Sequence, residues 1–212
     1  MELNITGTIF YTDELVDRIN NATDDITLVI NSPGGNAFGA LDVVNAIKNC
    51  KHKVTARIEV MACSAAAMIA LACDHITMEP HGILMIHKSW ALAVGNSNDL
   101  ESKAGALKAI DNAMNAAIET HCTDKTVIDR METGDVWMSG DEAREYFDNI
   151  EIVKTGGAGN VAAAVDVGAM ILEAARGPAS KDEVTDPTDP GETTPPAVEK
   201  RPVYDAVTLS LI

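Results

Sequence analysis

The chain has 212 residues, 46% of them hydrophobic, which suffices for one sizeable domain with an appendage. Its formal net charge of −16 argues against nucleic acid or an anionic membrane surface as a partner, because both would repel the protein at long range. The longest apolar run, inside residues 60–73, is too short to span a bilayer, and no signal peptide is evident. We therefore expect a cytoplasmic protein.

The first half of the chain alternates between two kinds of segment. Runs rich in β-branched and apolar residues predict strands at residues 3–10, 25–35, 53–60, 75–80 and 82–90. Segments with helical spacing or composition lie between the first four, at residues 12–22 with Thr12 as N-cap, at 36–50, and in the Ala-rich run 61–74. This alternation predicts an α/β domain with a largely parallel sheet.

The second half begins with one long predicted helix, residues 97–122, capped by Ser97 or Asn98. Its apolar residues are spread over more than one face, so the helix could dock outside its own domain. Two short helices follow at residues 124–132 and 139–147, the second capped by Ser139 in a segment with acids in its first turn. A last strand is expected at residues 149–153.

Composition divides the chain into four parts. The core domain is expected to cover residues 1–154, and an Ala/Gly-rich helical extension to cover 155–177. Residues 178–202 gather Pro, Thr and acids with hardly any large apolar residue, which predicts a disordered linker. A short apolar segment, 203–212, ends the chain.

The four cysteines indicate neither a metal site nor a disulfide scaffold. They form no CxxC pair and have no histidine at metal-ligand spacing. We expect them to pack as small hydrophobic residues in a reducing compartment. No metal and no cofactor is predicted; the residues concerned are Cys50, Cys63, Cys73 and Cys122.

Chemistry is suggested first by "INSPGG", residues 30–35, where Gly34 and Gly35 follow a predicted strand. Two glycines let the backbone turn with positive φ and leave N–H groups to face a ligand, although most such pairs are only turns. Ser64 follows the strand "ARIEV" and opens a helix, near the positive end of the helix dipole. It is either a nucleophile or an N-cap and small packing residue.

His87 ends an apolar strand, where an imidazole could act as general base for a serine at the same edge of the sheet. A carboxylate would then orient the imidazole, and Asp135 lies in a loop between two predicted helices, within possible reach. Spacing alone does not select it. The rival acids are Asp129, Glu132, Asp141 and Asp148.

Taken together, the motifs resemble the Clp peptidase (ClpP) family, in particular its phage-encoded head-maturation branch, over residues 4–153. "INSPGG" resembles the family's oxyanion-strand motif, and Ser64 falls in the place of its nucleophile. "MIHK" resembles the strand that carries the catalytic histidine, and "DVWMSGDEAREY" resembles the closing segment with its acid. The resemblance implies an α/β fold with a ClpP/crotonase-like spiral of βαβ units, and a protruding handle helix near residues 98–122.

The resemblance also implies roles for individual residues. Ser64 would be the nucleophile, His87 its general base, and Asp135 the residue that fixes the imidazole tautomer. The oxyanion would lie between the backbone N–H groups of Gly35 and Ala65. The residues expected to bind substrate, with those just after Gly35 pairing with it as an added strand, are Gly34, Asn36 and Ala37.

The implied function is that of a serine endopeptidase, a homo-oligomeric ring that cleaves capsid or scaffold polypeptides during phage head maturation. It would work in the bacterial host cytoplasm or the phage prohead. The axial loops with which housekeeping Clp peptidases contact their ATPase are not apparent, so we expect no ATPase partner and no need for ATP.

Four alternatives stay open. One is a crotonase-type acyl-CoA enzyme, which shares the βαβ spiral but uses acidic residues. Another is a Ser/Lys protease with Lys88 or Lys103 as its base. The third is a catalytically silent scaffold or assembly protein with the same fold. In the fourth, Cys63 replaces Ser64 as nucleophile.

Overall fold

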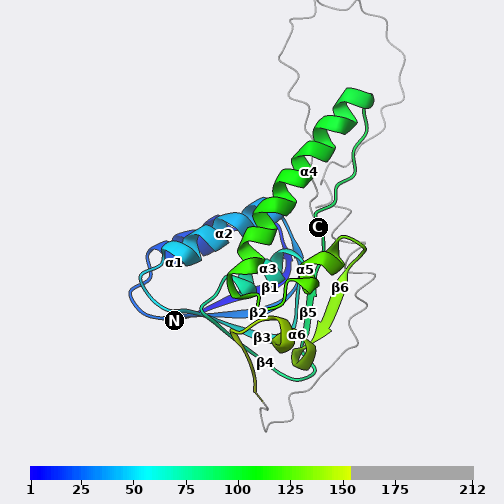
Figure 1. The fold of residues 1–212 in the computed structure, drawn as a ribbon. Coiled ribbons are helices and arrows are strands. Elements are labelled where there is room, and N and C mark those ends of the chain that lie inside the picture. Colours follow the sequence, from blue (N-terminus) through cyan, green and yellow to red (C-terminus); the bar gives the residue numbers. More distant parts are fainter. Residues whose placement is uncertain (154–212) are drawn as a thin grey trace, which may run out of the picture.

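Strands and helices alternate through the first half of the chain in the computed structural model, which describes residues 1–153 (Figure 1). The predicted extension 155–177, linker 178–202 and C-terminal segment 203–212 lie outside the described residues. The first half contains β1 (Glu2–Ile9), α1 (Asp13–Asn20), β2 (Ile26–Gly35), α2 (Ala37–Asn49), β3 (Val54–Cys63), α3 (Ala65–Leu71), β4 (His75–Met78) and β5 (Ile83–Ile86). The second half contains α4 (Ser97–Ile118), a 3-10 turn η1 (Glu119–His121), α5 (Thr126–Met131), β6 (Val136–Ser139), α6 (Gly140–Tyr146) and β7 (Ile150–Ile152).

The sheet is mostly parallel, as the alternation predicts. Strands β1, β2, β3, β4 and β7 lie side by side in that order, and all four pairings are parallel. The long strand β3 changes partner along its length: its first half pairs with β4 and its last three residues pair with β5. β6 runs antiparallel to β5. The α/β prediction is therefore confirmed.

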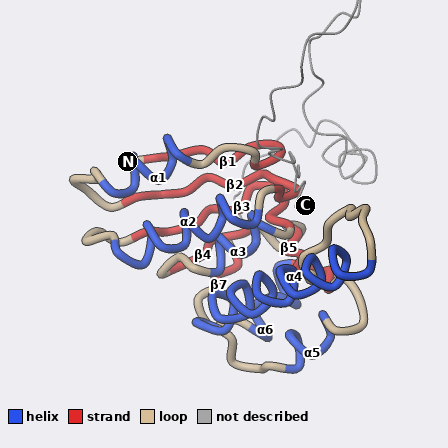
Figure 2. The backbone as a smooth tube through the Cα atoms, turned by 90° about the horizontal axis from the view of Figure 1, so that it is seen from above, coloured by secondary structure: helices blue, strands red, loops and turns tan. Residues whose placement is uncertain are grey.

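Helix α3 owes its Ala-rich sequence to its place in the core. All seven of its residues are buried, and the helix packs against β2 and β3 on one side and against α2 and α4 on the other. Small side chains let neighbouring backbones approach closely, which a helix enclosed on all sides requires. Figure 2 shows α1 beside β1 at one side of this core, and α5 and α6 at the other.

Helix α4 is the expected protruding helix, and it leaves the body of the domain in Figure 1. Its buried residues all lie in its C-terminal half, so that half anchors the helix while the N-terminal half projects. They are Ile110, Met114, Ala117 and Ile118.

The predicted caps of this helix are wrong by one or two residues. Asn96, rather than Ser97 or Asn98, is the N-cap, and its side chain accepts hydrogen bonds from the backbone of Asn98 and Asp99. The Asp99 carboxylate accepts the N–H of Asn96 in return, at 3.0 Å, and completes a capping box. Ser139, by contrast, caps α6 as predicted.

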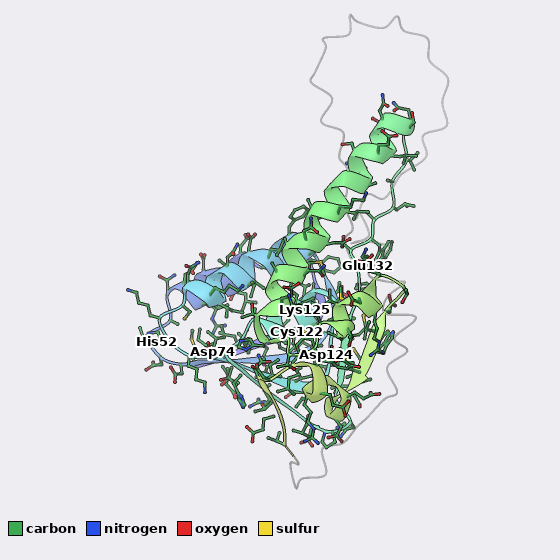
Figure 3. The ribbon with its side chains drawn as sticks, in the orientation of Figure 1. His52, Asp74, Cys122, Asp124, Lys125 and Glu132 are labelled. Carbon is green, nitrogen blue, oxygen red and sulfur yellow. The ribbon has the colours of Figure 1, made fainter. Side chains whose placement is uncertain are left out.

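The candidate functional residues lie at one end of the parallel strands. His52 and Asp74 precede β3 and β4, at the end where these parallel strands begin, and Glu132 lies on the opposite side of the molecule (Figure 3). The carboxyl ends of parallel strands are where ligand sites form in open α/β sheets. Ser64 follows β3 and His87 follows β5, so both lie at the carboxyl end of these parallel strands.

Candidate active site

The pairing of β3 with β5 brings Ser64 and His87 together. Cys63, the last residue of β3, lies opposite Met85 of β5 in a parallel register, and the Ser64 N–H donates to the Met85 carbonyl at 2.8 Å. One residue separates Met85 from His87, so both candidate groups leave the sheet at the same edge. The Ser64 hydroxyl oxygen and Nε2 of His87 are joined by a hydrogen bond of 2.7 Å.

Ser64 has an unusual backbone. Among the non-glycine residues in the range 1–153, only Ser64 has a positive φ. Its φ is 54° and its ψ is −123°. It lies at the N-cap position of α3, yet its side chain makes no capping hydrogen bond. A backbone of this kind costs about 1–3 kcal/mol and points to function. The reading of Ser64 as an ordinary N-cap is therefore wrong, because its hydroxyl faces His87 instead of the helix.

Asp135 reaches His87 through β6, a strand that the sequence analysis did not predict. The antiparallel register places Val136 opposite Ile86, so the residue before one lies beside the residue after the other. Nδ1 of His87 lies 3.5 Å from Oδ1 of Asp135. The imidazole thus has the serine on one ring nitrogen and a carboxylate near the other. The expectation of a plain loop between two helices is corrected: Asp135 directly precedes a strand.

Burial and charge act in opposite directions on His87. Its side chain is 12% exposed, and this burial lowers its pKa, while the nearby Asp135 carboxylate raises it. The net direction is downward, so the ring is neutral at neutral pH and its Nε2 can accept a proton from Ser64. Asp135 is more open to water, with 52% of its side chain exposed.

We expect the rate of Ser64 labelling by a fluorophosphonate to rise with pH through a midpoint below 6.5, the ordinary histidine pKa. Only neutral His87 can take the serine proton, and its pKa is lowered. Asp135→Asn removes a charge that raises this pKa, so the midpoint should fall further. The plateau rate should drop by roughly 10²-fold, less than for a fully buried triad aspartate. A midpoint at or above the ordinary value would contradict this account.

Residues 32–35, the last four of β2 and called here the glycine loop, pack against the candidate nucleophile. Ser32 of β2 lies opposite Ala62 of β3, which brings the end of β2 beside Ser64. The buried Ser32 hydroxyl donates to the Gly7 carbonyl at 2.6 Å and accepts the Gly34 N–H at 3.1 Å. This shaping role of Ser32 was missed, although "INSPGG" contains the residue.

Gly34→Ala is expected to lower the labelling rate of Ser64 by roughly 10²-fold, since an error near 1 Å in a catalytic group has that effect. Its φ is 103°, and an added Cβ would lie 2.7 Å from the Ser64 Cβ and 2.6 Å from the Cys63 carbonyl oxygen. The matched control is Gly105→Ala, where nothing lies within 4 Å. That variant should keep its labelling rate and gain about 1 kcal/mol of stability from helix propensity. Equal labelling of the two variants would refute the tight packing of the loop.

The added-strand expectation for substrate does not fit the chain after Gly35. β2 ends at Gly35, opposite Ile9 of β1, and the N–H of Asn36 donates to the Ile9 carbonyl at 2.8 Å. The Asn36 side chain caps α2, and Ala37 is the buried first residue of that helix. With its N–H used inside the fold and the chain turning into a helix, this segment cannot extend a strand beside a substrate.

Two alternative catalytic groups are disfavoured by their surroundings. Cys63 is buried, and burial raises the pKa of its thiol to about 12, so it stays protonated and poorly nucleophilic. Lys88 pairs with Glu132 at 2.5 Å, and this hydrogen bond raises the pKa of the amine, which is the wrong direction for a base. Lys103 belongs to the N-terminal, projecting half of α4.

The rival acids also have other partners or places. Asp148 pairs with His121 at 3.2 Å, and Asp141 lies 3.6 Å from Arg144. Glu132 is paired with Lys88, and Asp129 lies in the first turn of α5. Asp135 is thus the acid that the structure brings to His87.

Among residues 1–153, no group of three or more His, Cys, Asp and Glu side chains could hold a metal ion. Within the same residues, no helix has the length and hydropathy needed to cross a membrane.

Comparison with known proteins gives the family. The model of the Clp protease family matches residues 11–151. The ATP-dependent Clp protease proteolytic subunit of Bacteroides thetaiotaomicron is 30% identical over 125 residues, 58% of this chain and 57% of that protein. The proteolytic subunit 1 of Chlamydia abortus is 29% identical over 134 residues, 61% of this chain and 70% of the relative.

A relative of a different kind matches a shorter region. The membrane protein NfeD1b of Bacillus subtilis is 37% identical over 98 residues, which are 46% of this chain and 22% of that protein. The chain covers less than two thirds of the Bacteroides relatives. The family match nevertheless spans the glycine loop and the edge of the sheet where Ser64, His87 and Asp135 meet. This chain therefore belongs to the Clp protease family.

Proposed function

We propose that this chain is an ATP-independent serine endopeptidase of the ClpP type. The observation that carries the proposal is the 2.7 Å hydrogen bond between the Ser64 hydroxyl and Nε2 of His87. The strained backbone of Ser64 supports it, because the strain holds the hydroxyl toward His87 instead of the helix terminus. A crotonase-type reaction needs no such serine–histidine pair.

In the proposed reaction, the Ser64 oxygen attacks the carbonyl carbon of the scissile peptide while His87 Nε2 takes the serine proton. The tetrahedral intermediate collapses as His87 gives this proton to the leaving amine, which breaks the C–N bond. Water then attacks the acyl-enzyme by the same proton route. Asp135, 3.5 Å from Nδ1, holds the ring in the tautomer that leaves Nε2 free to accept.

The proposed oxyanion hole consists of the backbone N–H groups of Gly35 and Ala65. Ala65 is the first residue of α3, directly after the nucleophile. The end of β2, which carries Gly34 and Gly35, packs on that helix start, since a Cβ on Gly34 would lie 3.0 Å from the Ala65 nitrogen. Each donor of this kind contributes about 3 kcal/mol to transition-state stabilisation.

The proposed assembly is a homo-oligomeric ring. Leu92 and Val94 are 85% and 94% exposed on the segment that runs beside α4 to its projecting end (Figure 1). Neighbouring large apolar side chains that are exposed to water favour contact with another protein surface. A second copy of this chain is the partner we propose.

The proposed substrates are capsid or scaffold polypeptides cleaved during phage head maturation, in the bacterial host cytoplasm or the prohead. The resemblance of the motifs to the phage branch supports this step. The test incubates the purified protein, without nucleotide, with capsid and scaffold proteins and with an unfolded protein such as casein. Ser64→Ala is the control.

Cleavage by the wild type alone, without ATP, would support the proposal. Cleavage of casein but not of the head proteins would overturn the proposed substrates and still support the proposed peptidase activity. Assembled rings that cleave nothing would favour the silent scaffold instead.

A further inference from the structure

The chain directly after His87 lacks the support that a strand gives. β5 ends at Ile86, and residues 87–94 belong to no helix or strand. The candidate base is therefore the first residue beyond the last ladder pair, Ile86 opposite Val136. A general base must be held within hydrogen-bond reach of the proton it takes, so some other contact has to fix this segment.

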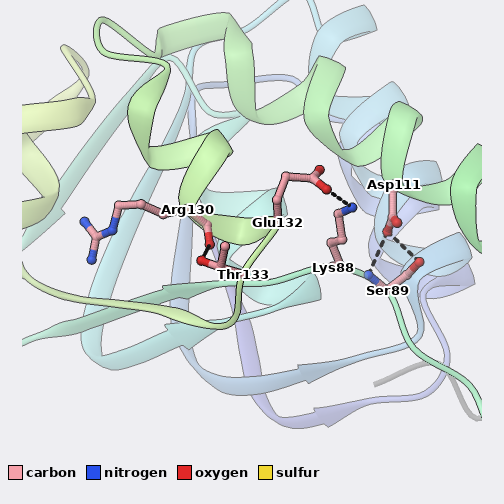
Figure 4. Close-up of polar contacts among 6 residues, drawn as sticks. All are labelled: Lys88, Ser89, Asp111, Arg130, Glu132 and Thr133. Atoms are coloured by element: carbon pink, nitrogen blue, oxygen red, sulfur yellow. Dashed lines mark hydrogen bonds and ion pairs between the residues drawn. The ribbon is translucent and has the colours of Figure 1, made fainter.

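Helix α4 supplies that contact through Asp111 (Figure 4). The backbone N–H of Ser89 donates to Oδ1 of Asp111 at 2.7 Å, and the Ser89 hydroxyl donates to the same oxygen at 2.6 Å. The hydroxyl also lies 3.2 Å from the Leu107 carbonyl, one turn earlier on the helix. All three contacts are partly shielded from water, and hydrogen bonds to a carboxylate are stronger than those between neutral groups.

A second contact, an exposed ion pair, holds this segment more weakly. Lys88 pairs with Glu132, the C-cap of α5, with their side chains 40% and 60% exposed. Exposed ion pairs of this kind contribute about 0–1 kcal/mol. Among the described contacts of residues 88 and 89, the two shielded hydrogen bonds to Asp111 are therefore the stronger restraint on this segment.

We propose that Asp111 is a positioning residue, which holds His87 against Ser64 by anchoring Ser89 to α4. The inference rests on the proposed peptidase function and adds a fourth side chain to the site. Asp111 touches neither Ser64 nor a substrate carbonyl in this role. It acts through the backbone two residues after the base.

The charge of Asp111 gives the proposal a separate signature. His87 is faced by Asp135 from the segment before β6 and by Asp111 from α4, and both carboxylates raise its pKa against the effect of burial. The neighbouring Lys88 is paired with Glu132. Removing the Asp111 charge should therefore lower the pKa of His87, which a residue needed only for stability would not do.

The test measures the rate at which a fluorophosphonate labels Ser64 in wild type, Asp111→Ala, Asp111→Asn and Asp99→Ala. Asp111→Ala should slow labelling by roughly 10–10²-fold, as expected when a catalytic group is misplaced by about 1 Å. Asp111→Asn should recover most of the rate, because its amide oxygen still accepts both bonds from Ser89. Its acid midpoint should lie at lower pH than that of the wild type.

Asp99→Ala is the matched control. Asp99 lies on the same helix and its carboxylate also accepts a backbone N–H, but it is twelve residues away, about 18 Å along the axis. This variant should label like the wild type. Should Asp111→Ala fail to fold, Ser89→Ala takes its place. It removes one of the two bonds, and about threefold slower labelling is expected.

Labelling of folded Asp111→Ala at the wild-type rate, or an Asp111→Asn variant as slow as the alanine variant, would overturn the positioning role. Failure of the peptidase proposal looks different, because the wild type itself would then label no better than Ser64→Ala. A readout independent of activity is the NMR titration of the His87 ring. Its midpoint should fall in Asp111→Asn and stay in place in Asp99→Ala.

Discussion

Ser64→Ala is expected to reduce the rate of peptide-bond hydrolysis by about 10⁶-fold, the loss seen when a serine nucleophile is removed. The Ser64 oxygen is the atom that would form the acyl bond, and the neighbouring Cys63 cannot replace it because burial keeps its thiol protonated. Hydrolysis of an unfolded protein substrate, measured on wild type and variant at equal concentration, checks this result. Activity retained by Ser64→Ala would show that Ser64 is not the nucleophile.

The fold should survive this change, and Ser64→Gly provides the control. The Ser64 side chain caps no helix, so its loss should leave the thermal unfolding midpoint of Ser64→Ala close to that of the wild type. Glycine adopts a backbone at φ 54° without the cost of a Cβ. Ser64→Gly should therefore be inactive yet more stable than Ser64→Ala by about 1 kcal/mol.

His87→Ala is expected to lower the rate by roughly 10⁴-fold or more, because the serine then has no group to take its proton. Lys88 follows directly in the chain but is held as a cation by Glu132. The control is His121→Ala. His121 also faces an aspartate, Asp148 at 3.2 Å, but it lies in the turn after α4 and outside the site.

Steady-state hydrolysis of the same substrate by both histidine variants checks the assignment. The His121→Ala rate should match the wild type. If His87→Ala kept a comparable rate, another base would serve Ser64 and the role of His87 would be lost.

The regular elements of the first half could be predicted because each carries its own signal. Alternation and β-branched residues mark β1, β2 and β3, and helical spacing marks α2. The four-residue strand β6 carries too little pattern of its own, since it exists through its antiparallel pairing with β5. The cap of α4 was misplaced because Asn96, Ser97 and Asn98 are all good capping residues, and the pair of hydrogen bonds between Asn96 and Asp99 distinguishes them.

The site could be predicted only in part, for a physical reason. Ser64 at a strand-to-helix turn and His87 at a strand end are local features, visible in the sequence. Their 2.7 Å separation depends on the partner change along β3, a long-range pairing that no local pattern specifies. Asp135 was chosen among several acids through the family resemblance, and its position beside His87 depends on the register of β6.

Two other residues escaped the sequence analysis for the same reason. Ser32 shapes the glycine loop through a carbonyl 25 positions away, and Asp111 holds Ser89 across 22 positions. Asn36 was misjudged for a different reason. The family resemblance implies a segment after Gly35 that pairs with substrate, whereas the Asn36 side chain caps α2, the helix that the spacing of residues 36–50 predicts.

The most direct test of the central claim is the mass-spectrometric mapping of a fluorophosphonate adduct. The wild-type protein is treated with the reagent at neutral pH and digested, and the modified peptide is sequenced, with particle mass measured on the same sample. The account predicts one phosphonyl group on Ser64, formed as fluoride leaves and His87 takes the proton, and none in Ser64→Ala. An unmodified Ser64 in assembled wild-type protein, or equal labelling of wild type and Ser64→Ala, would contradict it.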